Sequence, residues 1–91
     1  MCTMITESIA VAGSGKGSSG WLQLNKVSIS YDHPFSAPLD HALNLDFTNS
    51  EQPPGARVAV ELSAESAYQL AHTILTVLEK ARNGGYLEMD S

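Results

Sequence analysis

The chain has 91 residues, 43% of them hydrophobic, and a formal net charge of −5. This length allows one small domain with a modest core, and we expect residues 1–91 to form it. The hydrophobic content excludes a disordered chain. Five basic residues against ten acidic ones argue against a nucleic-acid surface, because phosphate binding needs clustered Lys and Arg.

The cysteine content and the hydropathy predict a cytoplasmic protein. The single cysteine, Cys2, excludes an internal disulfide framework and fits a reducing compartment. The N-terminal residues lack the basic and apolar regions of a signal peptide, and no apolar run approaches the length of a membrane span. We therefore expect a soluble protein that binds neither membranes nor nucleic acid.

The first predicted strand covers residues 4–12, where Ile5, Ile9 and Val11 share one face with Glu7. Glu7 on this apolar side has two interpretations. It lies at an edge or a bulge, or it is a buried carboxylate that serves as a general base. The sequence GSGKGSSG over residues 13–20 then predicts a flexible loop.

The second predicted strand covers residues 21–31 and contains a fault in its alternation. Leu22 and Leu24 have even numbers, whereas Val27, Ile29 and Tyr31 have odd numbers. One extra residue near Asn25–Lys26, a β-bulge in this strand, would bring both sets to one face. Residues 43–48 and 57–62 alternate cleanly between apolar and polar and predict two further strands, separated by the turn sequence SEQPPG.

The remaining chain predicts one helix. Ser63 is a suitable N-cap, and Gly84-Gly85 ends the helix after the basic residues Lys80 and Arg82. Apolar residues recur at helical spacing between these limits. The order β-β-β-β-α indicates an α+β fold, a four-stranded, mostly antiparallel sheet with the C-terminal helix packed on one face. An uncovered face or edge in so small a domain predicts a homodimer.

The glycine-rich segment resembles a phosphate-binding loop only superficially. The P-loop pattern fails at both ends, since Gly15-Lys16 is followed by Gly17 and the residue five before Gly15 is Ala10. No helix follows, so most of the anion-binding physics of such loops is missing. A backbone nest at Gly15 and Gly17 beside Lys16 would still bind an anion, and this stays open as an alternative.

The segment YDHPFSAPLDHAL over residues 31–43 holds two of the three histidines, His33 and His41. Pairing them across a hairpin places Val27, Ile29 and Tyr31 opposite apolar residues, and leaves every intervening pair polar. A slip of one residue would destroy this sorting, so the register is a firm prediction. It makes His33 and His41 cross-strand neighbours on the apolar side.

Two neighbouring imidazoles can share one metal ion. An antiparallel first strand would bring Cys2 to the same edge, which completes a Cys/His/His set for zinc, copper or nickel. Asp32 and Asp40 would point to the other face, where either would support a metal-binding histidine by a hydrogen bond rather than bind the metal itself. The alternative is that His33 and His41 are ordinary polar residues at the rim of the core.

Several short motifs are shared with a known family: MCTMI at the start, GSGKG followed by GW, then YDHP, HAL and DF. On these the chain resembles a family of small uncharacterised bacterial proteins, a domain of unknown function. The resemblance implies a stand-alone bacterial domain and brings no activity, cofactor or catalytic residue with it.

Three functions stay open on the sequence. The first is a small metal-binding protein with Cys2, His33 and His41 as ligands; if catalytic, it would use Glu7 or a bound water as base. The second is a non-catalytic homodimeric interaction module or accessory subunit that uses its sheet face or edge. The third is an anion-binding domain that uses Lys16 and the neighbouring glycines.

Overall fold

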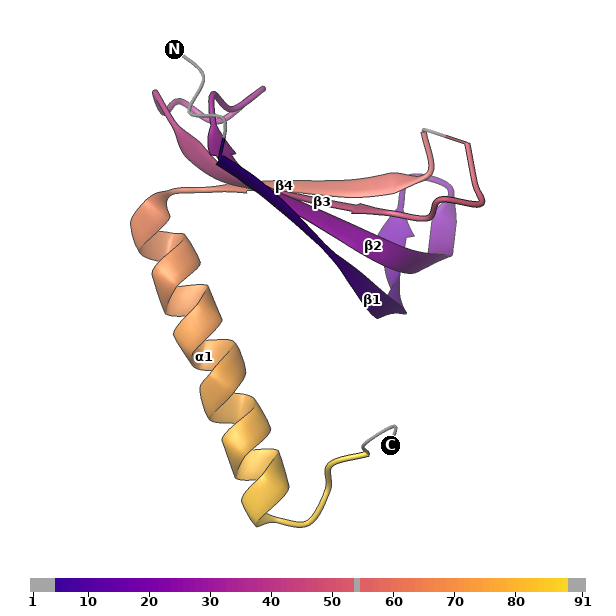
Figure 1. Ribbon diagram of the computed structural model, residues 1–91, viewed down its shortest axis with the longest axis vertical. Helices are drawn as coiled ribbons and strands as arrows, with labels where there is room; N and C mark the ends of the chain where they lie inside the picture. Colours follow the sequence, from indigo (N-terminus) through magenta and orange to yellow (C-terminus); the bar gives the residue numbers. More distant parts are fainter. Residues whose placement is uncertain (1–4, 54, 89–91) are drawn as a thin grey trace.

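The computed structural model describes residues 5–53 and 55–88. The strands are β1 (Ile5–Gly17), β2 (Gly20–Asp32), β3 (Ala42–Thr48) and β4 (Arg57–Leu62), and the helix is α1 (Ala64–Asn83). The strands form one antiparallel sheet in the order β1-β2-β3-β4 (Figure 1). The predicted α+β fold, a four-stranded antiparallel sheet followed by one helix, is confirmed.

The register between β2 and β3 is the one that the apolar and polar sorting predicted. The apolar pairs are Val27 with Phe47, Ile29 with Leu45 and Tyr31 with Leu43. The apolar face continues onto β4, which pairs with β3. It also continues onto β1, where Ile5 and Ile9 lie on this face with Glu7 between them. The opposite, polar face carries Ser, Asn, Asp and Arg side chains. The apolar face of the sheet therefore needs another element packed on it, and the polar face does not.

The predicted loop over residues 13–20 is wrong. β1 continues to Gly17 and β2 begins at Gly20, so that only Ser18 and Ser19 form the turn. Gly20 has a φ of 113°, a conformation that glycine adopts readily and other residues avoid. The glycine-rich composition therefore belongs to the end of a long hairpin and not to a flexible connection.

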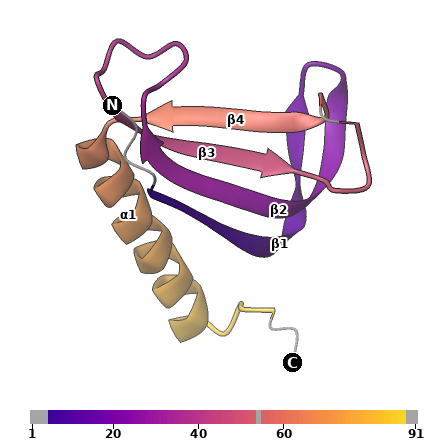
Figure 2. The ribbon, with the colours of Figure 1, turned by 45° about the horizontal axis from the view of Figure 1, so that its top comes forward.

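A β-bulge interrupts the pairing of β1 and β2 where the alternation of β2 changes. The register shifts between Ala10 and Gly13, where two β1 residues lie opposite Asn25. The predicted position is thus correct, but the extra residue is in β1 rather than in β2. Bulges bend a strand, and Figure 2 shows the far end of this hairpin rising across the ends of β3 and β4.

Gly15 lies where the bent hairpin approaches β4. A Cβ atom at Gly15 would lie 2.9 Å from Cδ1 of Leu24 and 3.1 Å from Cγ2 of Val58, whereas a Cβ at Gly13 would meet nothing within 4 Å. Leu24 is one of the buried residues in the described part of the chain, at 8% exposure. Glycine at position 15 therefore serves close packing of the hairpin.

The ends of α1 follow the prediction. The hydroxyl of Ser63, the N-cap, accepts the backbone N–H of Ser66 at 3.1 Å, and Gly84 caps the C-terminus. Lys80 and Arg82 occupy the last turn, where positive charge is favourable. Among the described residues no helix combines the length and the apolarity that a membrane span needs.

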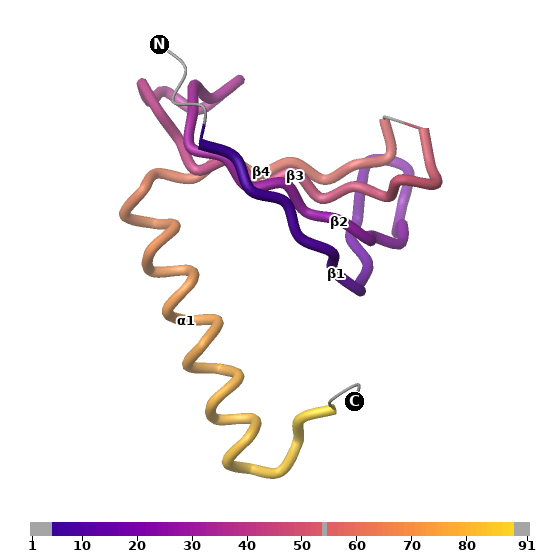
Figure 3. Tube along the Cα trace, viewed as in Figure 1, coloured from indigo at the N-terminus to yellow at the C-terminus, as the bar shows by residue number. Residues whose placement is uncertain are grey.

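α1 covers the apolar face only at one end. The helix leaves β4 through a single residue, Ser63, and then runs away from the sheet (Figures 1 and 3). No residue of α1 is buried, and the buried hydrophobic residues of the described chain are Leu24, Val27 and Ala42. The predicted packing of the helix on the sheet is therefore limited to its N-terminal turns.

Candidate functional site

The two histidines of the hairpin lie face to face, as the register predicted. The rings of His33 and His41 stack with their centroids 4.8 Å apart and their planes at 25°. His41 also stacks on Tyr31, with centroids 5.7 Å apart and planes at 19°. The end of the β2–β3 hairpin therefore carries three stacked rings, of which Tyr31 extends the apolar face and His33 is exposed.

The loop backbone orients the outer ring. Nδ1 of His33 lies 2.9 Å from the carbonyl oxygen of Asp40, and the carboxylate of Asp32 accepts the backbone N–H of His33 at 2.7 Å. A neutral His33 that donates its Nδ1–H to this carbonyl keeps the lone pair on Nε2, the tautomer found in many metal-bound histidines. Asp40 thus supports the ring through its main chain, whereas Asp32 holds the loop.

The stacked rings place two potential metal ligands side by side. Two imidazole nitrogens on one tetrahedral metal lie about 3.3 Å apart, given bonds of about 2.0–2.1 Å, so His33 and His41 would have to rotate to converge. The described residues contain no group of three or more His, Cys, Asp or Glu that could hold a metal ion. Cys2, the third predicted ligand, lies outside the described residues.

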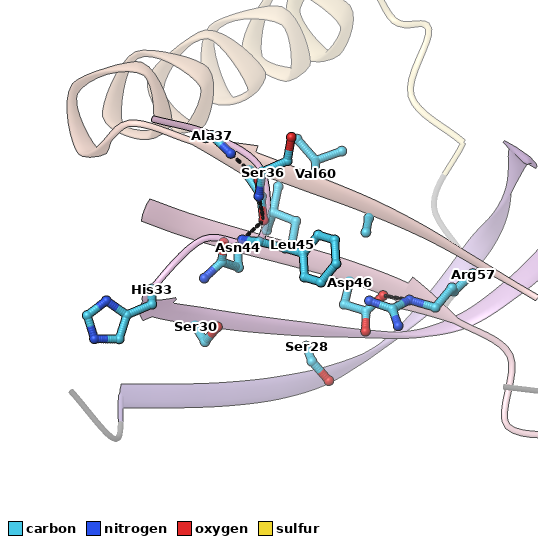
Figure 4. A pocket seen from close by; sticks show the side chains of 13 residues that line it. Ser28, Ser30, His33, Ser36, Ala37, Asn44, Leu45, Asp46, Arg57 and Val60 are labelled. Carbon is cyan, nitrogen blue, oxygen red and sulfur yellow. Dashed lines mark hydrogen bonds and ion pairs between the residues drawn. The ribbon is translucent and has the colours of Figure 1, made fainter. Parts of the chain in front are cut away.

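The same hairpin loop is held by Glu61, which the sequence did not single out. Its carboxylate accepts the backbone N–H groups of Ser36 at 3.0 Å and Ala37 at 2.9 Å, together with that of Phe35 (Figure 4). These hydrogen bonds, that from Phe35 first, lower the pKa of Glu61 below its usual 4.5. The carboxylate therefore stays ionised and fixes the loop on β4.

A weak signal for this arrangement is present in the sequence. Prolines have no backbone N–H, and Pro34 and Pro38 flank the three residues that donate to Glu61. Glu61 also has the polar parity of β4, shared with Arg57 and Ala59. Because the carboxylate and its donors are 24 to 26 residues apart, no local pattern joins them.

The polar face carries a hollow of about 810 Å³ beside this loop. Its floor is formed by short polar side chains such as Ser28, Ser30 and Asn44 (Figure 4), and Arg57 bonds Asp46 at 2.9 Å at its border. Oδ1 of Asn44 is buried and has no hydrogen-bond partner among the described residues. The ring of His33 points away from Asn44 in this view. The hollow thus has a mixed lining, with polar residues such as Ser28 and Asn44 beside apolar ones such as Phe35 and Val60.

Glu7, the predicted general base, is exposed on the edge strand β1, opposite Ile29 of β2. The buried position that this prediction assumed is therefore not the one in the structure. Of the two interpretations of Glu7 from the sequence, the structure agrees with the edge position. A catalytic role for Glu7 stays a prediction without structural support.

The glycines of the predicted anion site lie in a regular ladder. Gly15 pairs with Leu22, Lys16 with Trp21, and Gly17 with Gly20. A nest needs successive backbone N–H groups on one side, whereas in a strand they point alternately to its two sides, so that residues 15–17 do not form one. An anion site at Lys16 stays a prediction, and the strand conformation of residues 15–17 does not support a nest there.

A second hollow, of about 720 Å³, lies between the sheet and the helix, and we call it the apolar cleft. It is lined by the apolar face of β2, β3 and β4 and by the first half of α1, namely Ile29, Tyr31, Leu43, Leu45, Leu62, Ala64, Ala67, Tyr68, Leu70, Ala71 and Ile74. Beyond it, Leu75 is 64% exposed and Val77 58%. Large side chains that normally form a core therefore face solvent.

The apolar residues of α1 form a wide arc. At 100° per residue they occupy about 180° of the helix circumference, from Val77 and Leu70 on one flank to Leu75 and Tyr68 on the other. The opposite half is polar throughout. A helix that packs on one sheet needs an apolar stripe of only about 100°. The arc of α1 is therefore wider than a single contact surface requires.

The molecule is also more extended than its mass predicts. It exposes 7237 Å² of accessible surface, whereas a compact monomer of 9.7 kDa exposes about 5,100 Å². Its radius of gyration is 14.9 Å, against about 12 Å for a compact domain of this length. The chain thus exposes about 2,100 Å² more surface than a compact monomer, and its sheet face is uncovered and its helix unpacked.

Comparison with known proteins places the chain in a family without assigning it an activity. A family model described as a family of unknown function, DUF6295, matches residues 1–87. The chain therefore belongs to this family, in agreement with the resemblance seen in its motifs. No curated protein and no solved structure matches the chain.

Proposed function

We propose that the protein is a non-catalytic interaction module that acts as a homodimer, assembled through the apolar face of the sheet and the apolar arc of α1. The observation that carries the proposal is the excess of exposed surface. A stable interface buries about 800 Å² on each partner, and the excess of about 2,100 Å² on one chain exceeds that amount. The chemistry-bearing residues give no comparable argument for catalysis.

The nature of the exposed residues supports the same proposal. A monomer rarely exposes a contiguous apolar patch above a few hundred Å², and here the patch includes Ile5 and Ile9 on the sheet and Ile74, Leu75 and Leu78 on the helix, each between 47% and 64% exposed. A two-fold dimer buries the same patch on both copies. One contact therefore covers the sheet and the helix together.

The proposal is tested by a charged residue on the apolar arc. Leu75→Lys places an ammonium group in the interface, and we expect the dimer to dissociate. Thr76→Lys adds the same charge one residue later, on the polar half of α1, and should leave the dimer intact. Both variants place lysine, a good helix former, in α1. Light scattering after size-exclusion chromatography measures the masses, and a dimeric Leu75→Lys variant would refute the interface.

We also propose a transition-metal site at His33 and His41, for zinc, copper or nickel. The stacked rings and the support of His33 by the Asp40 carbonyl favour it. Elemental analysis of protein purified without a tag should find metal, and Zn²⁺ should raise the melting temperature. The gain should vanish in His41→Ala and persist in His72→Ala, which changes a histidine on the polar half of α1. Metal-free protein that Zn²⁺ does not stabilise would contradict the site.

A further inference from the structure

We infer that the apolar cleft is filled by helix α1 of a second copy, so that each helix lies between its own sheet and its partner's. The inference rests on the proposed homodimer and specifies how the two copies meet. It names one occupant for the cleft and excludes a dimer formed by pairing of the exposed edges of β1 or β4.

The width of the apolar arc is the first argument. Ala67 and Ala71 lie near its middle, and they line the cleft with their own sheet. Leu75 and Tyr68 on one flank are 64% and 71% exposed, and Val77 on the other flank is 58% exposed. An arc of about 180° is wide enough for two adjoining contacts, one with the helix's own sheet and one with the partner's, because each would cover about half of it.

The length of the helix is the second argument. Twenty residues span about 30 Å, and only residues up to Ile74 line the cleft. The second half of α1, with Leu75, Val77 and Leu78, therefore has no sheet of its own to pack on. A reciprocal arrangement gives this half the partner's apolar face, in particular the exposed Ile5 and Ile9 of β1.

The connection between sheet and helix is the third argument. β4 ends at Leu62 and α1 begins at Ala64, so that one residue, Ser63, joins them. Its hydroxyl caps the helix by accepting the N–H of Ser66. So short a capped connection holds the helix at its angle to the sheet, which keeps the cleft open for another element rather than closing the helix onto its own sheet.

The charged residues give the fourth argument, and they also indicate how the partner's helix is oriented on the sheet. Among the described residues Glu7 is the charged group of the apolar face, and Arg82 is the charged group on the apolar arc of α1. Arg82 bonds Glu79 in the same helix at 2.8 Å, an exposed pair that stabilises little. Placing the partner's last helical turn over β1 brings Arg82 to Glu7, beside Ile5 and Ile9.

Cross-linking between two different chains tests the arrangement. With Cys2→Ser in both, one chain carries Ile9→Cys and the other Leu78→Cys, and a short bismaleimide is added after subunit exchange. We expect a covalent heterodimer. The matched pair Ser8→Cys with Thr76→Cys, on the polar face and the polar half of α1, should give little product. Equal yields from the two pairs, or none from the first, would overturn the inference.

This experiment distinguishes failure of the helix exchange from failure of the homodimer itself. If the protein sediments as a dimer but Ile9→Cys and Leu78→Cys do not cross-link, the proposed homodimer stands and the helix exchange falls. If the protein is a monomer, both fall. A charge reversal checks the result without cysteines: Glu7→Arg and Arg82→Glu should each weaken the dimer about tenfold. The double variant should recover the native affinity, and a double variant as weak as the single ones would also overturn the proposed orientation.

Discussion

Glu61 determines how the hairpin loop lies on the sheet. Its two carboxylate oxygens accept three consecutive backbone N–H groups between Pro34 and Pro38. The substitution Glu61→Gln replaces one oxygen by an NH₂ group that faces these donors. We expect the loop to loosen, with faster amide exchange at Phe35, Ser36 and Ala37 measured by NMR. Glu65→Gln, at an exposed acid of the first helical turn, is the control and should leave these amides unchanged.

The same contact makes the loop sensitive to acid. The hydrogen bonds lower the pKa of Glu61 in the folded state below 4.5, so the stability that they add is fully present above that pH. It is lost as the pH falls through the lowered folded pKa, when the carboxyl takes up a proton. The amide shifts of Ser36 and Ala37 should therefore titrate below pH 4.5. Amide shifts that stay constant through this acid range would contradict the role of Glu61.

Gly15 carries a packing role that its glycine-rich neighbourhood conceals. A methyl group there would press on Leu24 and Val58 at 2.9 and 3.1 Å. We expect Gly15→Ala to lower the free energy of unfolding by about 1–3 kcal/mol through overpacking, as measured by urea denaturation. Gly13→Ala, which meets nothing within 4 Å, should change it by less than about 1 kcal/mol. Equal effects at the two positions would count against this role.

At the scale of residues, the sequence predicted what is local and missed what is distant. His33 and His41 were placed together because a single register sorts the hairpin. Glu61 was missed because its donors are more than twenty positions away. The glycines were interpreted as a loop and a possible nest, since composition does not reveal that Gly15 lies against Val58.

At the scale of elements, α1 has no buried residue in the single chain. An isolated helix of this length is marginal in water, and packing supplies most helical stability. We expect the amides of residues 75–83 to exchange more slowly as the protein concentration rises through the dimer range. In Leu75→Lys they should exchange fast at every concentration. Exchange that does not depend on concentration in the native protein would contradict an intermolecular contact at this half of the helix.

The elements themselves were largely predictable. The alternation of apolar and polar residues predicts the two sides of β3 and β4, and Ser63 and Gly84 mark the ends of α1. The bulge was predicted at the correct place, although its extra residue is in β1. The angle of α1 to the sheet was not predictable, because the helix leaves through one residue and the stripe that faces its own sheet is only part of a wider apolar arc.

At the scale of the whole molecule, the central feature is unburied apolar surface. The chain exposes 7237 Å², about 2,100 Å² more than a compact monomer of its mass. Its apolar sheet face and helical arc are continuous around one cleft. The proposed second copy would cover both at once, and would account for an amphipathic helix that its own sheet only partly covers.

Sedimentation equilibrium of the native protein tests this account most directly. We expect a mass of twice the 9.7 kDa chain at micromolar concentration, with dissociation to single chains on dilution. A mass of one chain at every concentration would contradict it, because the exposed face and helix would then have no second copy to cover them.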